Sequence, residues 1–442
     1  MRAYLASHQE YRVVFLLPER DYKKYPQLFG DGYNNLFFVE PVNVSNSKGF
    51  IQKLFYFFYS YLLYTNTTWM LATMGTRPDE PPAGGSMRRM LNPVKRAIAA
   101  TFGKSLWVRR CAVPAMFWRV FRERPFQNVF DSYQPDLVFV SHIYGWFDTN
   151  LLAEAKQRHI KTMGMPAGWD HLDKYFLPFP VDRMLAQSSW VKHAAIKYQS
   201  YKDEEVFIIG YPNFDYIASR VYEMPRADLL QKLNFPADAK LILYVSGSVY
   251  CPDEPDIIEE MVKWAERGEL AGNVYFVIRL YPRGRQGEKD FDERKFERLK
   301  SSSRVAFYLP EAWDDKDASK FLLNLILHAD IMIQVYTTMA LEATVLQRPL
   351  LSTPFDGYQK RPRHRSLRRF EKFEHFQDII KSGALASAYN FDELKMYINR
   401  YLEDPQYGAK ERRELRKNFC GPLDGHNSDR LVERIIEFVS ES

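Results

Sequence analysis

The chain has 442 residues, of which 46% are hydrophobic and 26% charged, and its 61 Lys and Arg outnumber its 55 Asp and Glu, for a net charge of +6. This composition is typical of a globular protein of roughly two or three domains, and it excludes a disordered, collagen-like or low-complexity chain. Cys111, Cys251 and Cys420 lie far apart and outside any Cys/His ligand spacing, which excludes a disulfide framework and a structural zinc site. The N-terminus lacks the basic start and apolar run of a secretory signal, so we expect a cytoplasmic protein.

The first unusual segment is residues 50–64, FIQKLFYFFYSYLLY, which is dense in aromatic residues. Its uninterrupted apolar part is shorter than the roughly 20 residues that a membrane-spanning helix needs, and Gln52 and Lys53 interrupt it. Because the aromatic residues surround the helix instead of forming one stripe, we expect a helix that is buried between other elements or docked on a surface. Contact with a membrane is the less favoured alternative.

A basic segment follows, in which residues 86–124 carry ten Lys or Arg against Glu123 alone. One interpretation is a solvated helical insertion. Another is a surface that attracts an anionic membrane or a phosphate-bearing acceptor through aromatic anchors, and nucleic-acid binding is a weaker third, since no recognition module accompanies the charge. The candidate contacts are Arg88, Arg89, Arg109 and Arg110, with Trp107, Phe117, Trp118 and Phe121 as anchors.

Short apolar strands alternate with helical segments along the whole chain. In the first half the expected strands are 12–17, 136–141, 161–165, 182–187 and 205–209, with helices at 151–157 and 190–198. After a polar joint at 212–234 the pattern repeats, with strands at 241–245, 274–278, 304–308, 331–335 and 350–352 and helices near 255–266, 318–328 and 338–346. This alternation predicts parallel strands joined by crossover helices.

The predicted fold is therefore an α/β protein with two Rossmann-like domains that face a cleft. We expect an acceptor-side domain at residues 1–220, with a basic helical insertion at about 50–130, and a nucleotide-donor domain at 221–425. Residues 428–439 form an amphipathic helix capped by Asn427 or Ser428, so the segment 426–442 is expected to pack back across the domains. Since open α/β sheets bind ligands beyond the carboxyl ends of their strands, the functional loops are sought there.

The strand at 331–335 is followed by groups that suit a nucleotide. The hydroxyls of Thr337 and Thr338 can cap the next helix while its free amides hold phosphate. Glu342 lies one turn further on the same face, where a carboxylate can accept hydrogen bonds from ribose hydroxyls. The ordinary alternative is a capped helix whose glutamate pairs with a nearby base.

Two neighbouring strand ends carry similar groups. Ser246, Gly247 and Ser248 form a small, hydroxyl-rich turn after the strand at 241–245, and glycine there allows close approach to an anion. Arg279 ends the strand at 274–278, and a guanidinium suits a diphosphate. Taken singly, these are also an ordinary turn and an exposed arginine. Three such strand ends in one domain together favour an anion site.

The second half resembles the nucleotide-binding domain of GT-B-type glycosyltransferases, especially the group that contains CDP-glycerol glycerophosphotransferases and surface-polysaccharide biosynthesis proteins. The motifs are SGS at 246–248, RLYP at 279–282, AD at 329–330 and TTMALEA at 337–343; in the first half they are GWDH at 168–171, VDRMLAQSSWVKHAA at 181–195 and IIGYPNFDYI at 208–217. The chain departs from the pattern at Tyr281, where the group often has histidine.

The resemblance implies a glycosyltransferase that moves a sugar from a nucleotide-activated donor to a surface polysaccharide or glycolipid. An inverting transfer needs a base in the first domain, and the candidates at strand ends are Asp170, favoured, with His142 and His171 as alternatives. No metal or tightly bound cofactor is required, since helix amides and arginines can neutralise the leaving diphosphate. Asp314 and Asp315 are interpreted as a polar loop.

The basic stretch 360–369, KRPRHRSLRR, includes Arg365 and is interpreted either as a contact for a phosphorylated acceptor or as a solvated loop. We expect the protein in the cytoplasm, with attachment to the inner face of the cell membrane as an alternative. Other activities left open are transfer of glycerophosphate from CDP-glycerol and nucleotide-sugar 2-epimerisation. A non-catalytic nucleotide-binding scaffold is the remaining alternative, supported by Tyr281 and by the irregular, helix-like start at residues 1–8.

Overall fold

The computed structural model describes residues 10–24, 37–73, 78, 85–281, 294–309 and 316–441. Residues 1–8, Asp314 and Asp315 lie outside the described residues. The chain divides into two compact units. Unit 1 comprises Met1–Tyr64, Pro93–Asp215 and Pro422–Ser442, and unit 2 comprises Thr65–Asn92 and Tyr216–Gly421. The predicted domain boundaries lie after residues 220 and 425, and this division places 65–92, part of the predicted insertion, in unit 2.

Unit 2 is built on a six-stranded parallel sheet with the strand order β12-β11-β10-β7-β8-β9. Counted along the chain within this sheet, the order is that of a dinucleotide-binding Rossmann sheet, in which the first and fourth strands are neighbours at the centre. The strands are β7 (Lys240–Val245), β8 (Val274–Arg279), β9 (Val305–Tyr308), β10 (Ile331–Gln334), β11 (Leu350–Ser352) and β12 (Leu385–Ser387).

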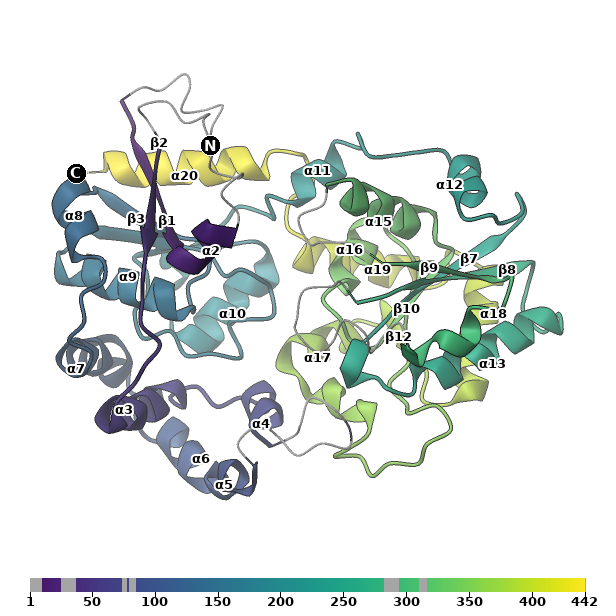
Figure 1. Ribbon diagram of the computed structural model, residues 1–442, viewed down its shortest axis with the longest axis horizontal. Coiled ribbons are helices and arrows are strands. Elements are labelled where there is room, and N and C mark those ends of the chain that lie inside the picture. Colours follow the sequence, from purple (N-terminus) through teal and green to yellow (C-terminus); the bar gives the residue numbers. More distant parts are fainter. Residues whose placement is uncertain are drawn as a thin grey trace. The chain divides into compact units, whose positions relative to one another are not determined.

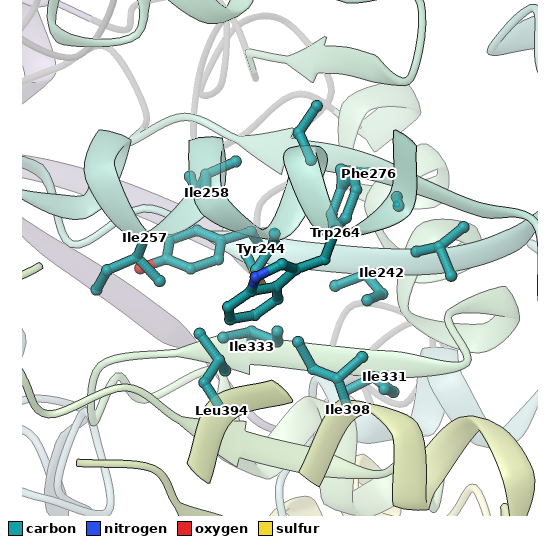
Figure 2. Packing of buried hydrophobic residues seen from close by; sticks show 14 of the residues in the cluster. Ile242, Tyr244, Ile257, Ile258, Trp264, Phe276, Ile331, Ile333, Leu394 and Ile398 are labelled. Carbon is teal, nitrogen blue, oxygen red and sulfur yellow. The ribbon is translucent and has the colours of Figure 1, made fainter. Parts of the chain in front are cut away.

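The central strands are buried on both faces, since Leu241 and Leu243 of β7 are as fully buried as Ile242 and Tyr244, and this explains why they are apolar runs without alternation. Residues of β7 and β10 pack with Trp264 of α13 and with Leu394 and Ile398 of α18, as Figure 2 shows. The indole of Trp264 is 5% exposed and lies among these strand residues. The helices of unit 2 are α4 (Asn66–Thr73), α5 (Gly85–Met90), α12 (Arg226–Lys232), α13 (Glu254–Glu266), α15 (Lys316–His328), α16 (Ala340–Val345), α17 (Glu374–Lys381), α18 (Phe391–Glu403) and α19 (Ala409–Phe419), with short turns η5 (Ser248–Tyr250), η6 (Glu297–Leu299) and η7 (Leu367–Lys372).

Unit 1 has a four-stranded parallel sheet in the order β3-β4-β5-β6 and a separate parallel pair, β1-β2. Its strands are β1 (Val13–Pro18), β2 (Phe37–Val42), β3 (Leu137–Val140), β4 (Lys161–Gly164), β5 (Arg183–Ala186) and β6 (Val206–Ile208). Its helices include α2 (Glu19–Lys24), α8 (Gln127–Tyr133), α9 (Trp146–Gln157), α10 (Ser189–Gln199) and α11 (Phe214–Ala218), which runs into unit 2, with the turn η4 (Asp203–Glu205). Both units therefore have the predicted parallel α/β architecture.

The last helix, α20 (Asn427–Ser440), packs on the sheet of unit 1 (Figure 1). Phe438 joins Met163 of β4 and Leu185 of β5 in one apolar cluster. The predicted caps do not operate, because the carboxylate of Asp215 accepts hydrogen bonds from the amides of Asn427 and Ser428, at 2.9 and 2.7 Å. This cap comes from a residue more than 200 positions away, so no local pattern announces it.

The basic region of unit 1 is helical, with α3 (Phe50–Ser60), α6 (Asn92–Ala100), α7 (Val113–Val120) and the turns η2 (Phe102–Lys104) and η3 (Val108–Ala112). In α3, Phe55 and Tyr59 are buried, whereas Phe50 is 82% exposed, so of the two expected arrangements burial between other elements is wrong for the N-terminal half of this helix. Phe117 and Phe121 are also buried, which corrects their expected role as surface anchors: together with Val113 they are spaced by four and face inward. No helix among the described residues is both long and apolar enough to cross a bilayer.

Candidate functional site

The centre of the unit 2 sheet is a topological switch point. β7 and β10 are neighbours, and the chain continues from β7 to β8 on one side and from β10 to β11 on the other. In open α/β sheets the loops diverge at this point and leave a crevice beyond the strand ends. Because all six strands are parallel, the ends of β7, β8 and β10 lie at the same edge, so the structure brings Gly247, Arg279 and Thr337 to one edge of one sheet.

The turn after β7 is held by buried charges that the sequence did not single out. Glu254 of α13 is fully buried, and its carboxylate accepts from the amide of Gly247 and lies 3.1 Å from the ammonium group of Lys295. The same ammonium group donates to Ser246 Oγ at 3.2 Å and to the carbonyl of Ser248 at 2.9 Å. The turn is thereby fixed in shape before any ligand arrives. Lys295 is more than 40 residues from the turn, so only the fold reveals it.

Gly247 is needed for a reason other than the one expected. A Cβ atom at this position would lie 2.4 Å from Cys251 Sγ and 2.8 Å from Glu254 Oε1, so the missing side chain makes room for the protein's own groups. Ser248 follows with φ = 53°, in the left-handed region, and its buried Oγ has no hydrogen-bond partner among the described residues. The Ser248 hydroxyl is a polar group at the strand edge that a ligand can satisfy.

The loop after β10 makes a sharp turn at Tyr336, where φ is 40°. Thr337 Oγ1 donates to the side-chain oxygen of Gln334, and Thr338 is exposed. The helix α16 begins at Ala340 with Met339 as its N-terminal flank, so neither threonine caps it as expected. The physical reason is that Gln334, at the end of the strand, competes for the Thr337 hydroxyl. The Thr338 hydroxyl remains at the surface of the loop.

Arg279 and Glu342 form the charged part of this edge. Arg279, at the end of β8, is 5% exposed, and its main-chain carbonyl accepts from the amide of Ser246 at 3.0 Å. Glu342 lies in the first turn of α16, and its buried Oε2 has no hydrogen-bond partner among the described residues. Burial raises the pKa of Glu342 to about 7, against the opposing effect of the nearby Arg279 charge. A cation and a carboxyl group with a raised pKa thus share a desolvated position.

We expect the Glu342→Gln variant to lose less stability than the natural protein as the pH rises from about 5 to about 8. The folded-state pKa of Glu342 lies above its unfolded value, so the native state keeps a proton that the unfolded chain releases, and stability falls through this interval. Between about pH 5 and about pH 8, the free energy of unfolding of the natural protein falls by about 2 to 3 kcal/mol more than that of Glu342→Gln. Urea titrations at several pH values measure it, with Glu433→Gln, an exposed position in α20, as the control. Parallel pH profiles for the natural protein and Glu342→Gln would contradict the buried position of this carboxyl group.

The predicted base Asp170 lies in a cluster at the carboxyl edge of β3 and β4 in unit 1. Its carboxylate pairs with Lys174, four residues further along the same loop, and lies 3.7 Å from His171 Nε2. The same imidazole nitrogen is 3.0 Å from the hydroxyl oxygen of Tyr144, whose ring stacks on Tyr175. The ammonium group of Lys174 already neutralises Asp170, and this favours a role in holding His171 and Tyr144 in place.

His142 and Asp148 belong to the same cluster, and the sequence analysis missed Asp148. The imidazole of His142 packs against the ring of Tyr144, and burial lowers its pKa, so the ring is neutral near pH 7. Burial raises the pKa of Asp148, in the first turn of α9, to about 7. Its Oδ2 lies 2.5 Å from the place a Cβ would take on Gly145, beside the imidazole ring. The sequence did carry a signal for Asp148: it is an acidic residue in the first turn of the helix that follows the strand end with His142.

The predicted contact arginines differ in where the structure places them. Arg109 is 8% exposed and bonds to the carbonyl of Tyr198, and burial lowers its pKa to about 10. Arg110 holds Glu205 through two hydrogen bonds of 3.0 and 2.7 Å. Both guanidinium groups are used inside unit 1, which differs from the outward role expected of them, because the backbone and a carboxylate of the same unit offer them partners.

The other contact candidates lie on unit 2. Arg89 is exposed on α5, and the side chain of Arg88 lies outside the described residues. Arg365 is exposed within a loop that is anchored on both sides, since Arg361 pairs with Asp253 and Asp356 while Arg369 is buried. The stretch 360–369 is therefore a tethered loop that presents Arg365 to solvent.

Comparisons with known proteins give the fold. No protein-family model matches the chain, and no curated protein matches it in sequence. A solved structure of a proposed UDP-N-acetylglucosamine 2-epimerase from Listeria monocytogenes has a TM-score of 0.50 at 16% identity and covers 72% of this chain and 78% of that one. The UDP-GlcNAc 2-epimerase of Neisseria meningitidis bound to UDP-GlcNAc has a TM-score of 0.50 at 13% identity, with 96% and 98% covered, and S. aureus MnaA with UDP has 0.50 at 13%, with 96% and 95% covered. The predicted fold class, two Rossmann-like units of the GT-B type, is confirmed.

Proposed function

We propose that this chain is a glycosyltransferase that binds a nucleotide-activated sugar on unit 2 and transfers the sugar to a carbohydrate or lipid-linked acceptor. The observation that carries the proposal is the switch point between β7 and β10, which has a buried cation, Arg279, at the next strand end and a desolvated carboxyl group, Glu342, on α16. A buried arginine at this edge suits an anionic ligand such as a diphosphate.

Each group at this edge has a role in the proposal. Arg279 neutralises the diphosphate. The amides of the rigid Ser246–Ser248 turn are used within the protein, so this turn offers the Ser248 hydroxyl, and the loop after β10 offers its amides and the Thr338 hydroxyl. Glu342 accepts from the ribose hydroxyls. Because its pKa is raised, this carboxyl group is partly protonated near pH 7 before the ligand binds. Hydrogen bonds from the ribose to the charged carboxylate then lower the pKa.

The transfer step needs a base. The acceptor hydroxyl oxygen forms a bond to the anomeric carbon while the bond from that carbon to the diphosphate oxygen breaks, and the acceptor proton passes to the base. We propose Asp148 as this base, because its pKa of about 7 suits proton transfer near neutral pH, whereas Lys174 neutralises Asp170. In this assignment Asp170, His171 and Tyr144 position the acceptor, and His142 shields Asp148 from water. Arg89 and Arg365 are candidates for contacts with acceptor phosphate.

A second candidate is nucleotide-sugar 2-epimerisation, and the fold shared with UDP-GlcNAc 2-epimerases favours it. It uses the same donor site and needs no acceptor. Transfer of glycerophosphate from CDP-glycerol and a non-catalytic scaffold are the remaining alternatives. Products separate all four: a sugar in an acceptor indicates transfer, an isomerised soluble sugar indicates epimerisation, phosphate in an acceptor indicates glycerophosphate transfer, and nucleotide binding with no product indicates a scaffold.

The proposal is tested by thermal melting of the full chain with UDP, CDP and GDP, and with inorganic phosphate as the control. We expect one nucleoside diphosphate to raise the melting temperature by about 5 °C at about a hundred times its Kd, since binding to the native state alone stabilises it by mass action. Incubation of radiolabelled donors with a lipid extract then identifies the product. A chain that melts at the same temperature with every nucleotide would contradict the donor site.

A further inference from the structure

Unit 1 exposes large apolar side chains in its basic helical region. Phe50 is 82% exposed, Ile51 70% and Trp107 68%, which is unusual for aromatic and branched side chains. We call this region the α3–η2 surface, defined by Phe50, Ile51, Leu54, Phe102, Leu106 and Trp107, each at least half exposed. All six residues belong to unit 1.

These side chains come from elements that pack together. α3 lies against α7, where Gln52 donates to the carbonyl of Val120 at 3.3 Å (Figure 1). On α3, Phe50, Ile51, Leu54 and Phe58 fall on one side by the helical period. The ring of Phe58 is 5.4 Å from that of Phe102, and the backbone turn that follows leads directly to Leu106 and Trp107. The aromatic contact joins the two groups of exposed residues into one surface.

The charge of these elements has a single sign. Residues 50–64 and 93–122 contain eight Lys and Arg and no Asp or Glu. Lys95, Arg109 and Arg110 are occupied inside the unit, Lys95 against the ring of Tyr61. The remaining five cations are exposed: Lys53, Arg96, Lys104, Arg119 and Arg122. Exposed cations and exposed apolar side chains thus lie in the same segments, and these segments contain no carboxylate.

We propose that the α3–η2 surface docks unit 1 onto an anionic phospholipid membrane. Trp107 and the two phenylalanines enter the interfacial layer, where aromatic rings are favoured, and the cations pair with lipid phosphates. The aliphatic side chains of Ile51, Leu54 and Leu106 favour a membrane over a nucleic acid as the partner. Aliphatic side chains gain nothing from the phosphate backbone of a nucleic acid, whereas they gain free energy in the acyl region of a bilayer. The inference does not depend on the donor site.

The experiment is co-sedimentation of the full chain with phospholipid vesicles. We expect binding to vesicles of equal parts phosphatidylglycerol and phosphatidylcholine, weak binding to phosphatidylcholine alone, and release at high salt, which screens the attraction. The triple variant Phe50→Ser, Leu54→Ser, Trp107→Ser lowers the partition coefficient by about a hundredfold. The double variant Lys104→Gln, Arg119→Gln lowers it by about tenfold.

The matched control is the double variant Val221→Ser, Met396→Ser, which removes exposed apolar side chains from unit 2 and leaves the partition unchanged. All variants are surface changes, and unchanged urea unfolding checks that they fold. Equal binding of the triple variant and the natural protein overturns the proposal, as does equal binding to vesicles with and without the anionic lipid. Self-association that the triple variant abolishes, without vesicle binding, overturns it in favour of a second copy of the chain.

Discussion

Arg279→Gln lowers the affinity for the nucleoside diphosphate by at least about a hundredfold, because the site loses its buried cation and the diphosphate is left without a charged partner. The loss is large because the position is desolvated. Arg279 is 5% exposed, so water has little access to stabilise the diphosphate charge when the guanidinium is absent. Isothermal calorimetry with the nucleotide that raises the melting temperature measures the change.

Two further variants make the result specific to Arg279. Arg279→Lys keeps the positive charge but loses the forked pair of donors, so we expect an intermediate loss of about tenfold. Arg413→Gln, on the exposed face of α19, leaves the affinity unchanged. If Arg279→Gln folds normally and binds the nucleotide as the natural protein does, the diphosphate does not lie at the end of β8.

Asp148→Asn lowers kcat by about 10² to 10⁴, the range that a general base contributes, while the affinity for the donor nucleotide stays the same. The dependence of activity on pH tests whether Asp148 is the base. Asp148 must lose its proton to act as a base, so activity rises with pH through its pKa of about 7, and this rise disappears in the variant. Steady-state kinetics across the pH range, with separate calorimetry of the donor, measures both quantities.

Asp170→Asn separates the two carboxyl groups of unit 1. If Asp170 positions His171 and Tyr144, we expect a higher KM for the acceptor, a smaller loss in kcat and a pH profile of unchanged shape. Asp131→Asn, an exposed partner of Arg158, is the control and leaves activity unchanged. Loss of turnover and of the alkaline rise in Asp170→Asn, with normal behaviour of Asp148→Asn, would reverse the assignment and return the role of base to Asp170.

The strands were predictable because each is a local apolar run bounded by polar or turn residues. The ten predicted strands are present, and each end lies within one residue of the prediction. β2 and β12 were not predicted: Phe37–Val42 contains Glu40 and Pro41, and Leu385–Ser387 is a short strand of which only the first residue is buried. Such edges take their conformation from neighbouring strands and not from their own sequence.

Of the candidate site, only the residues at the strand ends were predictable from the sequence. Ser246, Arg279 and Thr337 follow apolar runs in the sequence, and parallel strands bring such ends to one edge. Lys295 and Glu254 could not be predicted from the sequence, because an ion pair that supports a turn produces no periodic pattern. The aromatic residues of the basic region were misjudged for a related reason, since composition alone does not say which side of a helix faces the core.

By itself, the sequence determined that this protein alternates parallel strands with helices, that two such units follow one another, and which polar residues stand at the strand ends. These are consequences of apolar periodicity over a few residues. Only the tertiary structure decided that β10 lies beside β7, that Lys174 neutralises Asp170 while Asp148 is half-buried near His142, and that Asp215 caps α20. Strand order, desolvation and the choice of ionic partner depend on residues far apart in the chain, so they exist only once the chain has folded.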